Sequence, residues 1–246
     1  IMAEVQTRAV LLINGFDLSG FFKSIDESAT QDILDATTFD TDGAKDFKVG
    51  GHEREISGEG FFSYNETDAF SVDKLFSDAF SPSAERLFSF GMQGGITVGD
   101  IAVMANLMQS QYAIKEVVND LIMATFAAKP TKGATQSGYA RGIWLMSQTV
   151  TGAVNGTTVD NGASSVGYFA HVHNTNSDGP ATVKIQHSVD GSTWADLIDF
   201  GAVASVGAEQ AVNTATTVNR YRRAITTAIG GTTNKVSVAF KSAYSG

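Results

Sequence analysis

The stretch of residues 9–63 constrains the fold most strongly, because it alternates short extended runs with one tight turn and one long polar insertion. Residues 10–13 form an apolar run that ends at Asn14-Gly15, a pair that accepts the positive φ angles of a two-residue hairpin turn. A second extended run follows at residues 21–25. This part of the chain therefore predicts antiparallel strands.

A polar insertion at residues 28–48 separates the second run from a further strand at residues 53–62. We interpret the insertion as a long loop, and such loops are uncommon in compact domains and usually functional. In the strand that follows, Arg54, Ile56 and Gly58 share one face, while acidic and hydroxyl side chains occupy the other. The acids of the insertion are Asp32, Asp35, Asp40, Asp42 and Asp46.

The composition narrows the class of protein. The chain of 246 residues has no cysteine, which excludes disulfides and thiolate metal sites. Its 25 glycines and 3 prolines indicate many strands and turns. No apolar run reaches the roughly 18 residues that span a membrane, and the amino end lacks the pattern of a signal peptide. We therefore expect synthesis in the cytoplasm.

The negative charge lies in one part of the chain. Residues 1–142 contain 20 acidic and 11 basic side chains, whereas residues 143–246 contain six of each. The formal net charge of −9 therefore belongs to the first part. Such a segment is not expected to hold nucleic acid, because phosphate recognition needs Lys and Arg, but it suits a passage to which DNA must not adhere.

One helix is predicted after the strands. Apolar side chains recur at helical spacing over residues 69–80, Thr67 or Asp68 can cap the start, and Pro82 discourages continuation. The aromatic face of this helix should belong to the core. The apolar positions are Ala69, Val72, Leu75, Phe76, Ala79 and Phe80.

Strands are expected again at residues 86–90, 101–113 and 121–128. The last two are apolar on both faces, which fits either an interior strand or a strand that packs on a neighbouring subunit. Residues 129–141 have the composition of a loop. We place a domain boundary near residue 142, which divides the chain into residues 1–142 and 143–246.

The second part predicts an antiparallel β-sandwich. Short β-branched and aromatic runs alternate there with Gly, Asn, Ser and Asp clusters, and Asp190-Gly191 marks a hairpin turn. The candidate strands are residues 168–173, 182–187, 220–225 and 236–240.

The order of these features resembles a known family. A strand, NGFDLS, a strand, an acidic insertion and a strand containing EISGEGFF together resemble the major tail protein of long, non-contractile-tailed bacteriophages, or siphophages, over residues 9–145. The segments VDNGASSVGYFAHV, VKIQHSVDGSTWADL and VNRYRRAITT resemble a domain appended to phage tail and other virion proteins. The resemblance implies a mainly β fold, with a tail tube β-sandwich or barrel, one flanking helix and a long stacking loop. A C-terminal antiparallel sandwich of immunoglobulin-like or jelly-roll-like type would follow.

The same resemblance implies a structural function in the virion tail. Subunits would form six-fold rings whose sheets make a continuous inner barrel, and the rings would stack helically into the tube through which DNA is ejected. The implied partners are other copies of the chain and the tape measure, tail terminator and distal tail proteins. DNA would pass without specific binding, and neither a membrane, a cofactor nor an enzymatic activity is expected.

Two sets of residues are implied for assembly. The expected contacts between rings come from the insertion, at Asp32, Ile33, Leu34, Asp35, Phe39, Asp40, Asp42 and Phe47. The expected barrel and inter-subunit strands carry Arg54, Ile56, Met104, Met108, Met123 and Phe126.

Catalytic motifs are scarce, since the sequence has no G-x-S-x-G elbow, no P-loop and no dinucleotide fingerprint. His171 and His173 would point to the same side of a strand, and His187 on a paired strand could supply a third metal ligand. This weak candidate would suit a metal-dependent, cupin-like enzyme. The alternative is that the two histidines face solvent on a polar strand face.

An adhesin or carbohydrate-binding module is the alternative function. Tyr168, Trp194 and Tyr221 could form an aromatic platform for a sugar. The basic residues at 220, 222 and 223 fit an edge strand that contacts a partner or resists edge pairing better than they fit nucleic-acid recognition.

Overall fold

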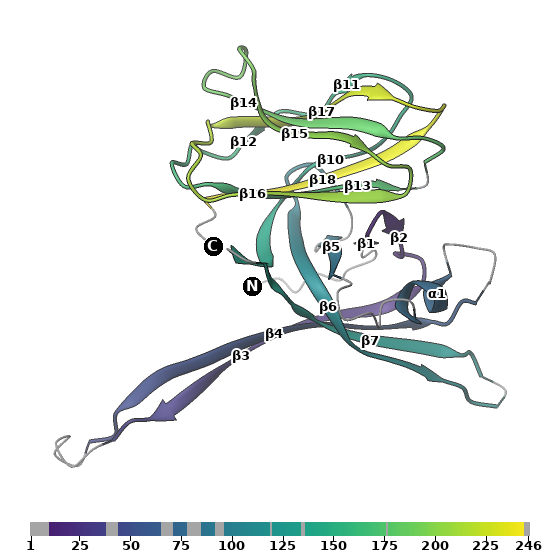
Figure 1. The fold of residues 1–246 in the computed structure, drawn as a ribbon, viewed down its shortest axis with the longest axis vertical. Coiled ribbons are helices and arrows are strands. Elements are labelled where there is room, and N and C mark those ends of the chain that lie inside the picture. The colour runs from purple at the N-terminus through teal and green to yellow at the C-terminus, as the bar shows by residue number, and fades with distance from the viewer. Residues whose placement is uncertain are drawn as a thin grey trace, which may run out of the picture. The chain divides into compact units, whose positions relative to one another are not determined.

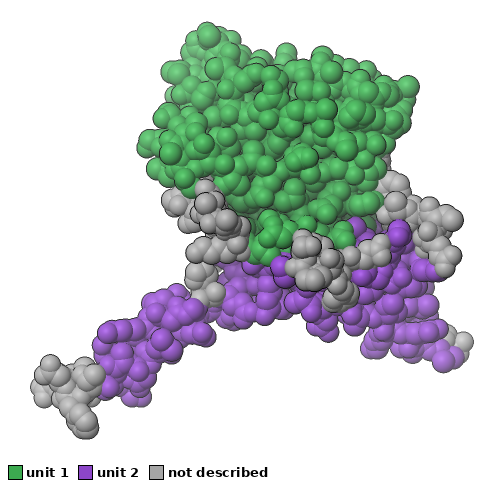
Figure 2. Space-filling view, in the orientation of Figure 1, with its two compact units in different colours: residues 1–20, 85–107, 131–246 green, residues 21–84, 108–130 purple. Residues whose placement is uncertain are grey.

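The protein is mainly β, and its antiparallel sheets do not close into a barrel within the residues described (Figure 1). The expected mainly β fold is confirmed. The chain divides into two compact units, which are coloured separately in Figure 2. Unit 1 comprises residues 1–20, 85–107 and 131–246, and unit 2 comprises residues 21–84 and 108–130. The computed structural model describes residues 10–37, 44–64, 71–77, 85–91, 96–118, 120–133, 136–175 and 177–243.

Unit 1 contains most of the strands. One of its sheets has the order β16-β13-β18-β10-β6-β5-β1-β2, and the other has the order β11-β17-β14-β15 with β12 also paired to β17. β8 and β9 form a small separate ribbon. The bounds are β1 (Val10–Ile13), β2 (Phe16–Asp17), β5 (Glu85–Gly91), β6 (Ile101–Lys115, of which residues 101–107 belong to this unit), β8 (Lys132–Gly133), β9 (Gln136–Ser137), β10 (Tyr139–Val150), β11 (Val154–Asn155), β12 (Val159–Asp160), β13 (Tyr168–Thr175), β14 (Ala181–Ser188), β15 (Ala195–Val203), β16 (Gly207–Asn213), β17 (Tyr221–Ile229) and β18 (Asn234–Ser242).

The predicted C-terminal sandwich is confirmed. Ala170 and Val172 of β13 and Val183 and Ile185 of β14 are fully buried in one core that both sheets share. These residues lie two apart on their strands, so period-2 alternation places them on the inner face of each sheet. The predicted turn at residues 190–191 joins β14 to β15, which pair antiparallel.

The opposite face of β13 is buried as well. Phe169 packs with Leu12, Met104 and Trp144 in a second core of unit 1. Both faces of this sheet are therefore covered by residues of the same chain, and residues 102–107 are buried without alternation.

The predicted turn at Asn14-Gly15 is confirmed, with φ angles of 48° and 85°. The Asn14 side-chain oxygen accepts a hydrogen bond from the backbone N–H of Leu87 at 2.7 Å. A Cβ atom on Gly15 would come within 2.4 Å of the backbone nitrogen of Gly207. Glycine is therefore required both for its φ angle and for the close approach of the β16 backbone.

Unit 2 is an extended sheet of order β3-β4-β7-β6 with one short helix. The described helix, Val72–Ser77, lies within the predicted residues 69–80, and the side chain of Ser71 accepts a hydrogen bond from the backbone N–H of Lys74 at 3.2 Å. The expected caps and the expected last turn lie outside the described residues. The bounds are β3 (Phe22–Asp35), β4 (Phe47–Phe61), β7 (Met123–Pro130), residues 108–115 of β6, and α1 (Val72–Ser77).

Residue 142 lies inside β10, where the sequence predicted a domain boundary. Residues 139–143 of β10 pair with β6, and residues 143–150 pair with β18. The loop expected at residues 129–141 contains β8, β9 and the start of β10. Independent folding of residues 1–142 and 143–246 remains a prediction. Among the helices described, none is long and apolar enough to cross a membrane.

Candidate assembly surfaces

Residues 28–35 and 47–48 of the polar insertion belong to the two strands of a long hairpin, so the expectation of a loop is wrong for these residues. β3 and β4 pair from Phe22↔Gly60 to Asp35↔Phe47, with one irregularity between Gln31 and Ile33. The strands extend far along the hairpin in Figure 1. Within the described residues, β3 pairs with β4 alone, and β7 pairs with β4 only over residues 56–61.

Local hydrogen bonds continue the hairpin beyond its last paired residues. Thr37 donates to the Asp35 carboxylate from its backbone N–H at 2.9 Å and from its hydroxyl at 2.5 Å. The backbone N–H of Asp46 donates to the Thr37 hydroxyl at 3.1 Å, and Ala36 donates to the carbonyl of Asp46 at 2.8 Å. The bonds from Thr37 lower the pKa of Asp35, which therefore stays ionised.

The far part of the hairpin exposes apolar side chains on one face. Ile33 and Val49 are directly paired, and Phe47 lies two residues before Val49 on the same face. Their exposed fractions are 71% for Ile33, 73% for Val49 and 55% for Phe47. We call these three residues the hairpin patch. Large apolar side chains grouped in this way usually mark an interaction surface.

The remaining residues expected at ring contacts divide into two groups. Leu34 is exposed on the opposite face of the hairpin, next to Gly50. Asp32 and Asp35 are exposed at the same end. The other three, Phe39, Asp40 and Asp42, lie outside the described residues.

The two faces of the unit 2 sheet differ sharply. On one face Ile56 and Phe126 are buried, and the Phe126 ring stacks on Phe76 with centroids 4.8 Å apart and meets Phe22 edge-on at 5.2 Å. Arg54 lies on this face as well and forms an ion pair with Glu27 at 2.9 Å.

The other face is acidic and hollowed. The carboxylates of Asp26, Glu55 and Glu59 lie around a shallow hollow, with hydroxyl and amide groups between them. The other polar side chains of the lining are Ser24, Ser57, Gln111 and Thr125. We call this surface the acidic face. Glu53 lies next to it and forms an ion pair with Lys129.

The residues expected on inter-subunit strands have different environments. Met104 is fully buried in the second core of unit 1, and Ile56 and Phe126 are buried in unit 2. Met108 is exposed on β6, and the Met123 sulfur lies 3.8 Å from the Lys23 ammonium group. Ile56, Met104 and Phe126 are therefore packed within their own units and stabilise the subunit, whereas Met108 is accessible to a second copy.

The two central histidines are fully buried, and the expectation that they face solvent is wrong. His171 and His173 do share one side of β13, as predicted, but they meet Ser89 of β5 there. The Ser89 hydroxyl lies 3.1 Å from His171 Nδ1 and 2.9 Å from His173 Nε2. Sequence reasoning missed this contact because β5 and β13 are far apart in the chain.

The hydrogen bonds of His173 leave no ring nitrogen for a metal. The backbone N–H of Gly15 donates to His173 Nδ1 at 3.3 Å, so neutral His173 carries its proton on Nε2 and donates it to Ser89. Burial lowers the pKa of His173 to about 3. Burial and the neighbouring His173 also hold the pKa of His171 well below its usual value.

A metal site at this position is not supported. His187 lies on β14 in the other sheet and accepts a hydrogen bond from the backbone N–H of Asn219. The part of the chain that the structure describes holds no group of three or more side chains that could bind a metal ion. The pair of histidines is therefore a neutral polar contact inside unit 1.

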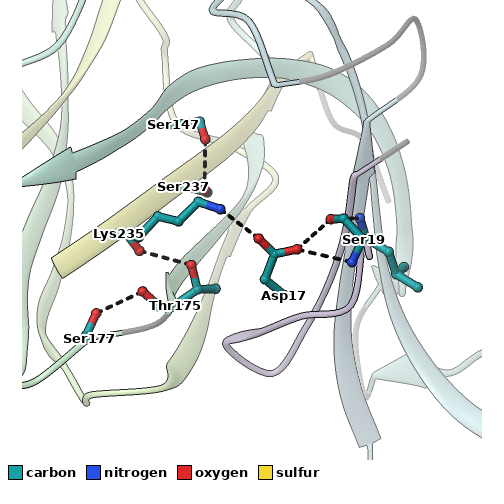
Figure 3. Close-up of polar contacts among 8 residues, drawn as sticks. Asp17, Ser19, Ser147, Thr175, Ser177, Lys235 and Ser237 are labelled. Atoms are coloured by element: carbon teal, nitrogen blue, oxygen red, sulfur yellow. Dashed lines mark hydrogen bonds and ion pairs between the residues drawn. The ribbon is translucent and has the colours of Figure 1, made fainter. Parts of the chain in front are cut away.

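A second polar contact in unit 1 joins residues 218 positions apart. The Lys235 ammonium group donates to the Asp17 carboxylate at 2.6 Å, and Ser19 donates to the same carboxylate from its backbone and its hydroxyl (Figure 3). Burial raises the pKa of Asp17, but the hydrogen bonds from Lys235 and Ser19 outweigh this effect and leave the pKa lowered. The start of the chain is thus tied to its last strand, which no local sequence signal indicated.

The three arginines near the end of the chain are engaged within the protein. Arg220 forms a forked ion pair with Asp160, and Arg222 is buried and donates to the backbone carbonyls of residues 161 and 162. Arg223 binds Gln186 through two nitrogens. The expectation that they lie on an edge strand is wrong, because β17 pairs with β14 on one side and with β11 and β12 on the other.

The proposed aromatic platform is divided between two sheets. The Trp194 ring lies over the Arg223 guanidinium group at 4.2 Å, and Tyr221 precedes this arginine by two residues on β17. Tyr168 instead lies on β13 of the other sheet and packs near Phe240. Only Trp194 and Tyr221 remain as a possible binding surface.

No family model and no curated protein matches the chain, and the similarities found are to solved structures. One likeness is to a chain in the virion of a native gene transfer agent particle, with 17% identity, a TM-score of 0.38, and coverage of 53% of this chain and 95% of that one. Another is to a chain in the anti-feeding prophage baseplate, with 8% identity, a TM-score of 0.42, and coverage of 57% and 95%. A third is to the Dit protein of phage SPP1, with 10% identity, a TM-score of 0.37, and coverage of 95% and 99%. Structural similarities of this extent do not indicate a function.

Proposed function

We propose that this chain is a structural subunit of a phage-type tail that polymerises into the tail tube. The observation that carries the proposal is the long hairpin of β3 and β4, whose hairpin patch is exposed in the single chain. A two-stranded ribbon is marginally stable by itself in water, and an apolar face on it is an aggregation hazard unless it has a partner. Repeated copies of the same subunit provide such a partner.

The strand edges of unit 2 support the same function. In the part of the chain described, no further strand pairs with the outer side of β3 or with β4 over residues 47–55, so both are edges of the sheet. Backbone groups of this kind pair readily with a strand from another chain. Edge pairing between neighbours would join the sheets around a ring, and head-to-tail contacts would stack the rings into a filament. Six-fold rings are the arrangement that the sequence resemblance implies.

The acidic face suits the wall of a passage for DNA. Asp26, Glu55 and Glu59 share the sign of the phosphates, and each ring would repeat them. At a Debye length of about 8 Å in physiological salt, carboxylates on the wall remain effective for a duplex that passes close to them. Their repulsion would prevent adhesion of DNA during ejection. The tape measure, terminator and distal tail proteins would fill or end such a tube.

Polymerisation is the direct test. Negative-stain electron microscopy of the concentrated full-length chain should show hollow tubes with a regular axial repeat. Sedimentation at several protein concentrations should show growth above a threshold. A chain that stays monomeric at all concentrations and salt conditions would refute the proposed function.

Charge reversal tests the role of the acidic face. Tubes that carry Glu55→Lys and Glu59→Lys should form normally but retain linear duplex DNA at low salt and release it as salt is raised. Glu209→Lys, at an exposed position on β16 of unit 1, is the matched control and should retain no more DNA than the wild type. Equal retention by the variant and the control would remove the electrostatic part of the mechanism.

A saccharide-binding module is the second candidate function. It is favoured by the indole of Trp194, whose ring centroid lies 4.2 Å from the guanidinium carbon of Arg223. Trp194→Ala should abolish binding on a glycan array if this function is correct, whereas it should leave tube formation unchanged if the chain is a tube subunit.

A further inference from the structure

A second group of exposed apolar side chains lies in unit 2, in the connection between β6 and β7. Val118 is 87% exposed, and Ile114, Val117 and Leu121 are exposed beside it. The backbone N–H of Asp120 donates a hydrogen bond to the carbonyl of Val117 at 3.1 Å. We call these four residues the turn patch. Among the described residues of unit 2, the other exposed large apolar side chains are Leu34, Tyr64, Met108 and the hairpin patch.

The register of the strands places the two patches at opposite ends of the unit 2 sheet. β4 begins at Phe47, in the hairpin patch, and ends at Phe61, which pairs with Met123 immediately after the turn. Phe62 also donates to the carbonyl of Ile122 at 2.9 Å. The 15 residues of β4 therefore separate the patches by roughly 45 Å at about 3.3 Å per residue. The hairpin end and the β6–β7 turn lie at the two ends of the sheet in Figure 1.

We propose that the hairpin patch of one copy docks on the turn patch of a second copy. This inference rests on the proposed function, and it identifies the surface that receives the hairpin. Two patches so far apart cannot satisfy each other within one chain. Each copy therefore carries the hairpin patch at one end of its unit 2 sheet and the turn patch at the other end. A contact between unlike ends is head-to-tail, and it propagates without limit unless the geometry closes.

The chemistry of the patches fits a dry contact between two copies. Ile33, Phe47 and Val49 are β-branched or aromatic and lie on a pleated face, and the turn presents β-branched Ile114, Val117 and Val118 and the branched Leu121. Contact between these side chains would remove both groups from water, which is the main driving force for association. An alternative partner for the hairpin patch is the same patch of a second copy, which would produce closed dimers in place of chains of subunits.

Complementation between two variants distinguishes these arrangements. The hairpin variant carries Ile33→Thr, Phe47→Thr and Val49→Thr, and the turn variant carries Val117→Ser, Val118→Ser and Leu121→Ser. Each variant alone should be monomeric, with a threshold concentration for assembly raised at least about tenfold. An equimolar mixture should form dimers and nothing longer, because only one intact pair of ends remains. Val189→Thr, which changes a 73% exposed side chain of unit 1 outside both patches, is the control and should assemble like the wild type.

Assembly of the turn variant alone would mean that the turn is not the acceptor, and a monomeric mixture would mean that the two patches do not meet. Circular dichroism spectra and unfolding midpoints equal to those of the wild type would exclude misfolding as the reason why either variant stays monomeric.

Cross-linking separates a failure of this inference from a failure of the proposed function. The chain has no cysteine, so Val49→Cys with Val118→Cys introduces one thiol in each patch. Oxidation with diamide should yield a ladder of linked chains, while the single Val49→Cys variant should yield none. Tubes without the ladder would overturn this inference and leave the proposed function standing. A ladder without tubes would support the contact and refute the tube.

Discussion

Acidification from pH 7 to pH 5 is expected to destabilise unit 1 through its buried histidines. The pKa of His173 is lowered to about 3 in the folded chain, against about 6.5 in the unfolded chain. The unfolded state therefore binds a proton over this range and the folded state does not, so stability is complete above pH 6.5 and is lost as the pH falls toward 3. The loss for one such histidine between pH 7 and pH 5 is about 2 kcal/mol. His171, whose pKa is lowered in the same direction, adds to it.

Urea unfolding at the two pH values measures this loss. Trp194→Phe leaves buried Trp144 as the only tryptophan, and its fluorescence then reports on the core of unit 1. The double variant His171→Gln, His173→Gln should lose much less unfolding free energy than the wild type between pH 7 and pH 5. It keeps the contribution of His187, whose pKa is also lowered by burial and by Arg222.

The variant Asp178→Asn is the control that shows whether a carboxylate contributes to the loss of stability between pH 7 and pH 5. The hydrogen bonds from Thr232 and Thr233 lower the pKa of Asp178 to about 2 in the folded chain, against about 3.9 in the unfolded chain. The contribution of Asp178 to the free energy of unfolding is therefore lost only below about pH 4. The Asp178→Asn variant should lose as much free energy of unfolding between pH 7 and pH 5 as the wild type. A wild-type chain equally stable at both pH values would refute the reasoning, as would a double variant that loses as much as the wild type.

Three further sets of substitutions test contacts within unit 1 or within unit 2. Phe126→Ala should destabilise unit 2 by about 3–5 kcal/mol in denaturant unfolding, because its ring fills the aromatic core; a cost below about 1 kcal/mol would contradict this packing. Gly15→Ala should lower the thermal midpoint more than Gly20→Ala, since only the former brings a Cβ against the β16 backbone, and equal midpoints would contradict the close approach. Asp17→Asn and Lys235→Met should show a coupling energy of about 1 kcal/mol in a double-mutant cycle, and additive effects would exclude the pair.

Local chemistry explains which parts of the fold could be predicted. The turn at Asn14-Gly15 and the hairpin at residues 190–191 follow from positive φ angles that few residues accept, and both are present. The inward residues of β13 and β14 follow from period-2 alternation. These features depend on neighbours in sequence, so the sequence alone contains the necessary information.

The hairpin of β3 and β4 could not be recognised from the same patterns. Its outer half is exposed on both faces, and it therefore lacks the alternation by which a half-buried strand is identified. Asp32 and Asp35 made the segment look like a loop, although backbone pairing and the bonds from Thr37 order it. The burial of His171 and His173 was missed for a different reason, because Ser89 reaches them from more than 80 positions away.

Truncation tests how far the two parts of the chain fold independently. A division at residue 142 predicts that residues 1–150 fold without the rest. The second core of unit 1 argues against this result, because Leu12, Met104 and Trp144 pack there with Phe169 and Ala239, which a fragment of residues 1–150 lacks. β10 would also lose its partner β18, and Asp17 would lose Lys235.

We therefore expect this fragment to expose its apolar residues. Its tryptophan emission should be red-shifted toward that of a solvated indole, since Trp144 is its only tryptophan, and it should bind a hydrophobic dye. The full-length chain is the control. Cooperative urea unfolding of the fragment, with a blue-shifted emission, would show that β6, β10 and the first hairpin form a core without β13 and β18. The acidic first part would then be a folding unit that evolution could join to different second domains.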